Sequence, residues 1–273
     1  MIVLTSGETL DCGETRDVKM TDNDFEETRR LWDSIAEDWR IQVGSQGDRN
    51  RFLNSDPVLW AFAGDVAGLR VLDAGCGTGY LTRQLSDRGA DATGTDFSER
   101  MIAVAKEQNP GVDFRTDPSE QLITCGDGEF DLVVSNYSLM DTPALEETMA
   151  AFNRVLKVKG RAVLVFSHPC FPQGRAREED KANTVSYRWD DSYFERHRRA
   201  DPPWGHFTSD FIWFHRPLSD YWKAFVGAGF VVANFEEPRV GTGSYDLAAS
   251  AEELEKFKSR PYSAAFLLKK GMA

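Results

Sequence analysis

Positive charge is scarce in this sequence. Its 273 residues include 44 Asp and Glu but only 32 Lys and Arg, which gives a formal net charge of −12 at pH 7. A surface of this sign repels the phosphates of nucleic acids, and acidic residues interrupt the one basic cluster, over 188–199. We therefore expect a small-molecule substrate and no nucleic acid partner.

Long apolar runs are also missing. No stretch approaches the roughly 20 apolar residues that cross a bilayer. The N-terminus turns polar after four residues and has no basic region ahead of an apolar core, so it does not read as a signal peptide. We predict a cytoplasmic protein with no membrane partner.

Cysteines are few, and their spacing forms no C-x-x-C pair, so zinc or redox chemistry has little support. The four are Cys12, Cys76, Cys125 and Cys170. We expect free thiols in a reducing compartment and no bound metal. A chain of this length buries enough surface to fold without disulfide or metal staples.

What the sequence does contain is a regular alternation of strand and helix patterns after residue 70. Apolar spacing predicts strands over 71–73, 91–96, 112–115, 130–135, 161–166, 229–236 and 264–269, and helices over 24–39, 57–62, 78–88, 98–106, 143–156 and 218–228. Such alternation predicts an α/β fold with a parallel sheet covered on both faces. We expect an extension and helical cap over 1–60 and one α/β domain over 61–273.

The alternation stops between residues 167 and 216, a segment called the insertion below. It has no sustained period, and a long irregular segment inside a compact fold is usually a functional lid. Its aromatic residues predict the roof of a pocket, although at least half of them must pack a small core: Tyr187, Trp189, Tyr193, Phe194, Trp204, Phe207, Phe211, Trp213 and Phe214. Trp32 and Trp39 are interpreted mainly as core residues, with a cover over a bound ligand as the alternative.

A glycine-rich turn follows the first strand of the α/β domain. Gly75, Gly77 and Gly79 allow backbone angles that a Cβ would oppose, and they let a ligand approach the main chain closely. Glycines alone would equally suit a dinucleotide. Asp73 before the turn suits an ammonium group better than a pyrophosphate, and Asp96 at the end of the next strand can accept both ribose hydroxyls.

These residues carry a family resemblance. The segment V-L-D-A-G-C-G-T-G-Y, followed by a strand ending in G-T-D-F-S, resembles the class I S-adenosylmethionine-dependent methyltransferases, in particular the branch that acts on small molecules, including the quinone-biosynthesis type. The likeness covers 70–166 well and 217–236 more loosely. It implies a Rossmann-like, seven-stranded, mostly parallel sheet whose last strand is antiparallel. The pattern of the chain itself adds an N-terminal helical extension and a lid inserted after the fifth strand.

The resemblance also implies S-adenosyl-L-methionine as the cofactor and a set of residues that hold it. The methionine part would lie along the turn, on Asp73, Gly75, Cys76, Gly77, Thr78 and Gly79. Asp96 would hold the ribose, while Phe97, Ser98, Met101, Asp117, Pro118 and Ser119 would lie near the adenine, and Asn136 and Tyr137 beside the sulfonium. Pro118 departs from the small residue that is usual there, which affects the expected backbone contact.

Three histidines are candidates for a general base, because imidazole titrates near neutral pH. His168 directly follows a strand, at the sheet edge where ligands of open α/β folds bind. The alternative for His168 is a role in fixing the turn before Pro169. His206 and His215 lie in the insertion, where each could contact the substrate or only support the lid.

The sequence thus predicts methyl transfer to nitrogen or oxygen of a small, aromatic or amine-bearing metabolite, with a homodimer as one possible assembly. Aminopropyl transfer on the same fold is one alternative. A protein that binds S-adenosylmethionine without catalysis is another, and a nicotinamide dehydrogenase is a third. The motifs identify no acceptor, because in-line methyl transfer needs alignment more than a dedicated set of catalytic groups.

Overall fold

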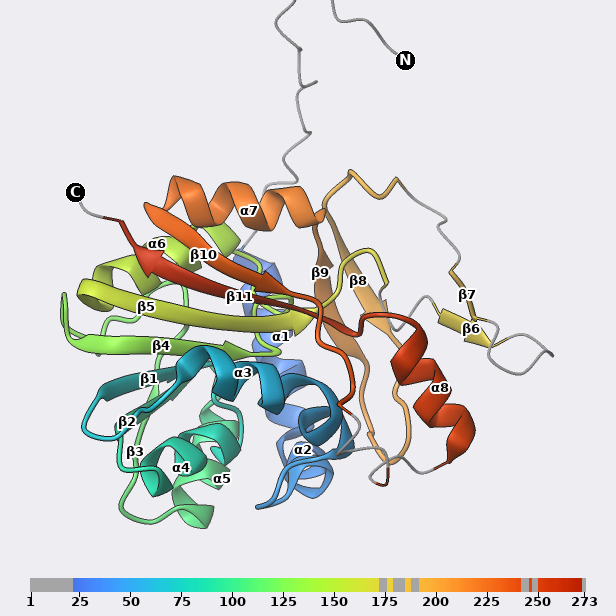
Figure 1. Cartoon of the computed structure of the whole chain (residues 1–273). Coiled ribbons are helices and arrows are strands. Elements are labelled where there is room, and N and C mark those ends of the chain that lie inside the picture. The colour runs from blue at the N-terminus through green and yellow to red at the C-terminus, as the bar shows by residue number, and fades with distance from the viewer. Residues whose placement is uncertain are drawn as a thin grey trace, which may run out of the picture.

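A seven-stranded sheet forms the centre of the molecule in the computed structural model (Figure 1), which describes residues 22–171, 176–178, 185–187, 192–241, 246 and 250–271. The strand order is β10-β11-β5-β4-β1-β2-β3. The strands are β1 (Arg70–Ala74), β2 (Asp91–Asp96), β3 (Asp113–Thr116), β4 (Phe130–Asn136), β5 (Leu156–Ser167), β10 (Phe230–Glu236) and β11 (Ser263–Lys270). Residues 1–21 of the predicted extension and helical cap over 1–60 lie outside the described residues.

Six of these strands run in one direction, and only the last strand, β11, is reversed. Strands β1, β2 and β3 pair in parallel, as do β1, β4 and β5, whereas β11 is antiparallel to both β5 and β10. The seven-stranded, mostly parallel Rossmann-like sheet predicted from the sequence is therefore confirmed. Its central strands are apolar on both faces, and Val133, Val134 and Val163 are fully buried.

Helices cover both faces of the sheet, as Figure 1 shows. On one face, α6 (Leu145–Val155) and α7 (Leu218–Gly227) bury Phe152 and Phe225 in the core. On the other face, α3 (Asp56–Ala63) and α4 (Tyr80–Asp87) bury Leu59 and Leu85. Next to α4, α5 (Glu99–Gln108) begins at Ser98, whose hydroxyl accepts the backbone N–H of Met101 at 3.0 Å.

The predicted helix over 24–39 is in fact two helices. Helices α1 (Asp22–Ser34) and α2 (Ala36–Val43) meet at the buried Ile35, which has non-helical backbone angles as the N-cap of α2. A single π-helical turn, η1 (Arg51–Ser55), leads from the following loop into α3. None of the helices over the described ranges is long and apolar enough to span a membrane.

The insertion contains short antiparallel ladders rather than only irregular chain. Strands β8 (His197–Asp201) and β9 (Phe211–His215) pair along their whole length, and β6 (Ala176–Glu178) pairs with β7 (Val185–Tyr187). In Figure 1 the β8–β9 ribbon stands beside the end of the sheet where β5 ends. The side chains of Tyr187 and Trp189, two residues of the predicted aromatic roof, lie outside the described part. Helix α8 (Ala251–Ser259) was not predicted.

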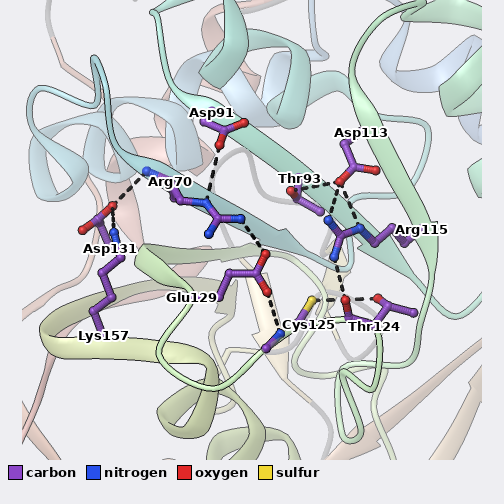
Figure 2. Close-up of polar contacts among 11 residues, drawn as sticks. Arg70, Asp91, Thr93, Asp113, Arg115, Thr124, Cys125, Glu129, Asp131 and Lys157 are labelled. Atoms are coloured by element: carbon purple, nitrogen blue, oxygen red, sulfur yellow. Dashed lines mark hydrogen bonds and ion pairs between the residues drawn. The ribbon is translucent and has the colours of Figure 1, made fainter.

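Polar contacts join the opposite end of the sheet, where the parallel strands begin (Figure 2). The backbone N–H of Arg70 donates to Asp131 at 2.9 Å, and its guanidinium contacts Glu129 at 2.6 Å. Lys157 also reaches Asp131 at 2.8 Å. These pairs are partly exposed, so each adds little stability, but together they tie β1 to β4 and β5 on the side away from the glycine-rich turn.

Candidate active site

The glycine-rich turn connects β1 to α4 at the carboxyl end of the sheet. Gly75 and Gly77 have φ values of 77° and 53°, which other residues rarely adopt. The backbone N–H groups of Gly75 and Cys76 donate to the carbonyl of Thr95 at 2.8 and 2.9 Å, and that of Gly77 donates to the carboxylate of Asp96 at 2.9 Å. The turn is thus attached to the end of β2, and a Cβ at Gly75 would collide with Ser138.

Two buried carboxyl groups flank this turn. Asp73 is 2% exposed and accepts the hydroxyl of Thr82 at 2.7 Å. Burial, together with a smaller effect from the charge of Asp96, raises the pKa of Asp73 to about 7. Burial likewise raises the pKa of Asp96 to about 6, against hydrogen bonds from the N–H groups of Ser98 and Gly77. A cation bound between the two would favour their ionised forms.

These groups open into a cavity of about 910 Å³, called the turn cavity below. Most of the residues expected to hold a cofactor line it: Asp73, Gly75, Cys76, Gly77, Thr78, Asp96, Phe97, Met101, Ser119, Asn136 and Tyr137. They come from the ends of β1, β2 and β4, from the turns and loops that follow β1, β2, β3 and β4, and, for Met101, from α5. The structure therefore brings together positions that lie as much as 64 residues apart, between Asp73 and Tyr137.

Gly79, Ser98, Asp117 and Pro118 do not line the turn cavity. Ser98 caps α5 and donates its hydroxyl to Asp33 at 2.6 Å, which attaches α1 to the sheet. The carboxylate of the fully buried Asp117 accepts the backbone N–H groups of Ile123 and Thr124 at 3.1 and 2.7 Å. These side chains support the walls from behind, and Glu120 lines the cavity near the expected adenine position instead.

Arg51 is a cavity residue that the motifs did not single out. It lies in η1, is 8% exposed, and forms an ion pair with Asp48 at 3.0 Å. Its guanidinium lies 5.6 Å from the ring centre of Trp39 and 5.7 Å from that of Tyr80. Its place in the polar segment 47–51 is the one signal in the sequence that could have pointed to it.

The tryptophans of the N-terminal helices line this cavity and a second one. The second, called the aromatic cavity, has a volume of about 1420 Å³ and shares Trp32, Trp39, Arg51, Tyr137 and Asp141 with the turn cavity. The two indole rings meet edge to face with centres 5.4 Å apart. The placement agrees with the alternative interpretation, in which the N-terminal helices cover a ligand site.

The insertion closes over the aromatic cavity and is attached to the same helices. The hydroxyl of Thr208 donates to Asp38 of α2 at 2.7 Å, and Arg198 pairs with Glu27 of α1 at 2.7 Å. Trp204, Phe211, Trp213 and Asp201 of the insertion line the cavity. The lid and the helical cap therefore form one wall, opposite the ends of β4 and β5.

Tyr137 lies between the two cavities and lines both of them. Its φ of 55° is unusual for a residue other than glycine, and such strain is often found at functional sites. Its hydroxyl accepts from the side-chain amide of Asn54 at 3.0 Å, donates to Asn50 at 3.2 Å and contacts Ser263. The ring is thereby fixed between the N-terminal loop and β11.

Comparison with known proteins agrees with this geometry. Residues 72–164 match a family described as a methyltransferase domain. Residues 72–164 therefore carry a methyltransferase domain. The match spans β1 to β5 and therefore includes the glycine-rich turn, Asp96 and Tyr137.

Curated relatives match part of the chain. It is 32% identical to a demethylmenaquinone methyltransferase of Renibacterium salmoninarum over 149 residues, 54% of this chain and 61% of the relative. It is 39% identical to a ubiquinone biosynthesis O-methyltransferase of Dechloromonas aromatica over 103 residues, 36% of this chain and 44% of the relative. The chain thus spans between 44% and 61% of the length of these two relatives.

Solved structures share the fold of the methyltransferase domain over a longer range. One from Listeria monocytogenes, named a putative S-adenosylmethionine-dependent methyltransferase, has a TM-score of 0.66 at 24% identity and covers 79% of this chain and 96% of its own. A 1,6-didemethyltoxoflavin-N1-methyltransferase of Burkholderia thailandensis has a TM-score of 0.56 at 15% identity, with 94% of each chain covered. At these identities the likeness shows the fold alone.

None of the three candidate histidines lines the turn cavity or the aromatic cavity. In His168, Nδ1 accepts the backbone N–H of Cys170 at 3.2 Å, so Nε2 carries the proton and donates to Glu237 at 2.9 Å. Burial lowers its pKa, although Glu237 opposes the shift. This geometry fits the turn-fixing alternative.

The other two histidines each donate a ring N–H to a backbone carbonyl, because a carbonyl oxygen can only accept. Nε2 of His206 lies 2.9 Å from the carbonyl of Asp38, and Nε2 of the buried His215 lies 2.8 Å from that of Tyr193. His206 thus helps to attach the insertion to α2, and His215 supports the insertion from within. The carboxyl of Asp141, unlike these histidines, lines both the turn cavity and the aromatic cavity, near the expected position of the acceptor.

Proposed function

We propose that the chain transfers a methyl group from S-adenosyl-L-methionine to nitrogen or oxygen of a small, aromatic or amine-bearing metabolite. The observation that carries the proposal is the turn cavity, in which two buried carboxyl groups and one buried guanidinium surround the glycine-rich turn. That charge pattern complements a ligand with an ammonium, a sulfonium, a ribose and a carboxylate. The methyltransferase relatives support the reaction class.

The residues of the turn cavity fit this cofactor, on two observations. Oδ1 of Asn136 is buried and has no hydrogen-bond partner in the described part of the chain, so it can accept an N–H from a ligand. Asp73 and Asp96 have raised pKa values because they are buried, and a cationic ligand would replace the lost hydration. Asp73 would hold the ammonium and Asp96 the ribose hydroxyls.

Arg51 favours a cofactor that retains its carboxylate. Its guanidinium is the cation of the turn-cavity lining, and it can bind a carboxylate through paired hydrogen bonds. Aminopropyl transfer uses the decarboxylated cofactor, which would give the guanidinium of Arg51 no carboxylate to bind. A nicotinamide dinucleotide is disfavoured because its pyrophosphate would lie beside Asp73.

The aromatic cavity favours catalysis over simple cofactor binding. It adjoins the turn cavity and provides space for an acceptor. When bound in the turn cavity, the cofactor would supply an electrophilic methyl group. The chain's own part is to align the acceptor and to exclude water with Trp32 and Trp39, and alignment can contribute about 7–11 kcal/mol at most. We also propose that the partner is a small molecule rather than a nucleic acid, and that the chain functions alone or as a homodimer.

The test is a calorimetric titration of the full chain with S-adenosylhomocysteine, decarboxylated S-adenosylmethionine and NADH in separate runs. We expect binding of S-adenosylhomocysteine, weaker binding of the decarboxylated compound because it lacks the group that contacts Arg51, and no binding of NADH. Tight NADH binding without binding of S-adenosylhomocysteine would refute the proposal.

A further inference from the structure

Building on the proposed methyl transfer, we propose that the acceptor is an aromatic amine-bearing cation, bound in the aromatic cavity with its ammonium group on Asp141, and that Asp141 takes the proton which the nitrogen must lose before it is methylated. The inference narrows the acceptor atom to nitrogen. It assigns a role to a residue that neither the motif nor the cofactor requires.

Asp141 lies where the acceptor nitrogen would have to be. It follows β4 and lines both the turn cavity and the aromatic cavity, so a group bound to it is next to the cofactor and inside the acceptor space. Its backbone N–H donates to the carbonyl of Ser138 at 2.9 Å. The backbone N–H of Phe214 in β9 donates to Met140 at 2.8 Å, which fixes the loop from the side of the insertion.

The carboxylate of Asp141 is available to a ligand. Within the described residues no hydrogen bond or ion pair engages it, whereas the other acidic groups of the aromatic cavity already have partners. Asp48 pairs with Arg51 at 3.0 Å, and Asp201 accepts the indole N–H of Trp213 at 2.6 Å. Of the three acidic groups that line the aromatic cavity, Asp141 is thus the one left for a cation.

The walls select the same kind of ligand. Three acidic groups and one guanidinium line the aromatic cavity, so its charge is negative and an anionic acceptor would be repelled. Half of the lining residues are aromatic: Trp32, Trp39, Tyr137, Trp204, Phe211, Trp213, Phe257 and Tyr262. Aromatic faces bind flat apolar bodies and stabilise adjacent cations.

Asp141 can also remove the proton that blocks the reaction. An ammonium has no lone pair with which to attack. Burial raises the pKa of Asp141 well above its usual range, the charge of Asp96 raises it further, and only Arg216 opposes the shift. Tyr221, which faces both groups, has a raised pKa because it is buried and stays neutral. The carboxylate of Asp141 is therefore a stronger base than an exposed one and is suited to accept a proton.

The bond changes balance without a further reactant. One N–H bond of the ammonium breaks, and the proton passes to the carboxylate of Asp141. The freed lone pair forms the bond to the methyl carbon while the carbon–sulfur bond breaks, and that electron pair stays on sulfur. The product is a methylated ammonium and a neutral thioether, and the proton on Asp141 leaves to solvent after release.

The experiment measures binding of a matched series of probes to the full chain saturated with S-adenosylhomocysteine. The series consists of tryptamine, N-acetyltryptamine and indole-3-acetate, which share one ring system and differ in charge. We expect tryptamine to bind, and to bind at least tenfold more tightly than the other two. Asp141→Asn should weaken tryptamine binding by roughly ten- to a hundredfold. Asp210→Asn, which changes an exposed acid of the insertion, should not alter it.

Turnover provides the second readout. With labelled S-adenosylmethionine, kcat/KM for tryptamine should rise with pH through the titration of Asp141, and Asp141→Asn should lower kcat and abolish that rise. Tighter binding of the acid or the amide, or unchanged tryptamine affinity in Asp141→Asn, would overturn the inference while leaving methyl transfer intact. Failure of S-adenosylhomocysteine to bind wild type would instead overturn the proposed function.

Discussion

Replacing Asp73 by Asn should reduce the loss of stability that the ligand-free protein undergoes as pH rises. Asp73 is buried beside the turn, and its pKa is raised from 3.8 to about 7. A carboxyl whose pKa is higher in the folded state stabilises the fold at low pH, where it is protonated in both states. That stability is lost as pH rises from about 4 to about 7, because the unfolded chain releases the proton first.

The size of the effect follows from the shift. A difference of about three pKa units at 1.36 kcal/mol per unit corresponds to roughly 4 kcal/mol of stability lost across this window. Asn resembles the protonated carboxyl in shape, can still accept the hydroxyl of Thr82, and does not ionise. Asp73→Asn should therefore match wild type only below about pH 4, exceed it increasingly as pH rises, and be more stable by up to roughly 4 kcal/mol at pH 8.

Urea denaturation at pH 5, 6, 7 and 8, followed by tryptophan fluorescence, measures this difference. The same variant should bind S-adenosylmethionine more weakly, because it has no charge for the ammonium. Binding to wild type at pH 7 should release protons, which is seen as a dependence of the calorimetric enthalpy on the ionisation enthalpy of the buffer. Parallel pH curves for wild type and Asp73→Asn would refute the assignment of Asp73 as a carboxyl held for a cation.

Three further substitutions separate the roles inferred above. Asp96→Ala should weaken S-adenosylhomocysteine binding by about 1–3 kcal/mol in calorimetry, since it removes a charged acceptor from the ribose hydroxyls; unchanged affinity would exclude Asp96 from the site. Arg51→Met should weaken S-adenosylmethionine more than its decarboxylated form, and an equal loss for both would separate Arg51 from the carboxylate. His168→Asn should lower the free energy of unfolding by about 1–3 kcal/mol with kcat retained, whereas a loss of kcat with intact stability would restore His168 as a base.

Local sequence patterns predicted the part of the fold that local chemistry determines. The strand over 91–96 has the predicted bounds, and Ser98 caps the helix after it, because both depend on neighbouring residues. The glycine-rich turn was also recognisable, since its backbone angles require glycine. The reversal of the last strand came from the family resemblance and not from a local pattern.

Non-local packing determined the rest. Arg51 and Asp141 belong to no motif and face the cavities only because η1, the loop after β4 and the insertion meet at one edge of the sheet. His168 follows a strand at the right edge, but the backbone of Cys170 and the side chain of Glu237 occupy both its nitrogens. Residue type and position in the sequence could not show which side chains already had partners.

The most direct test of the account is transfer of a labelled methyl group. The full chain would be incubated with methyl-labelled S-adenosylmethionine and a pool of small metabolites, with Asp96→Ala as the control. The account predicts label in a small, amine-bearing product, formation of S-adenosylhomocysteine in equal amount, and a strong reduction of both in the control. Binding of the cofactor with no label in any metabolite would contradict it and would indicate a protein that binds S-adenosylmethionine without methyl transfer.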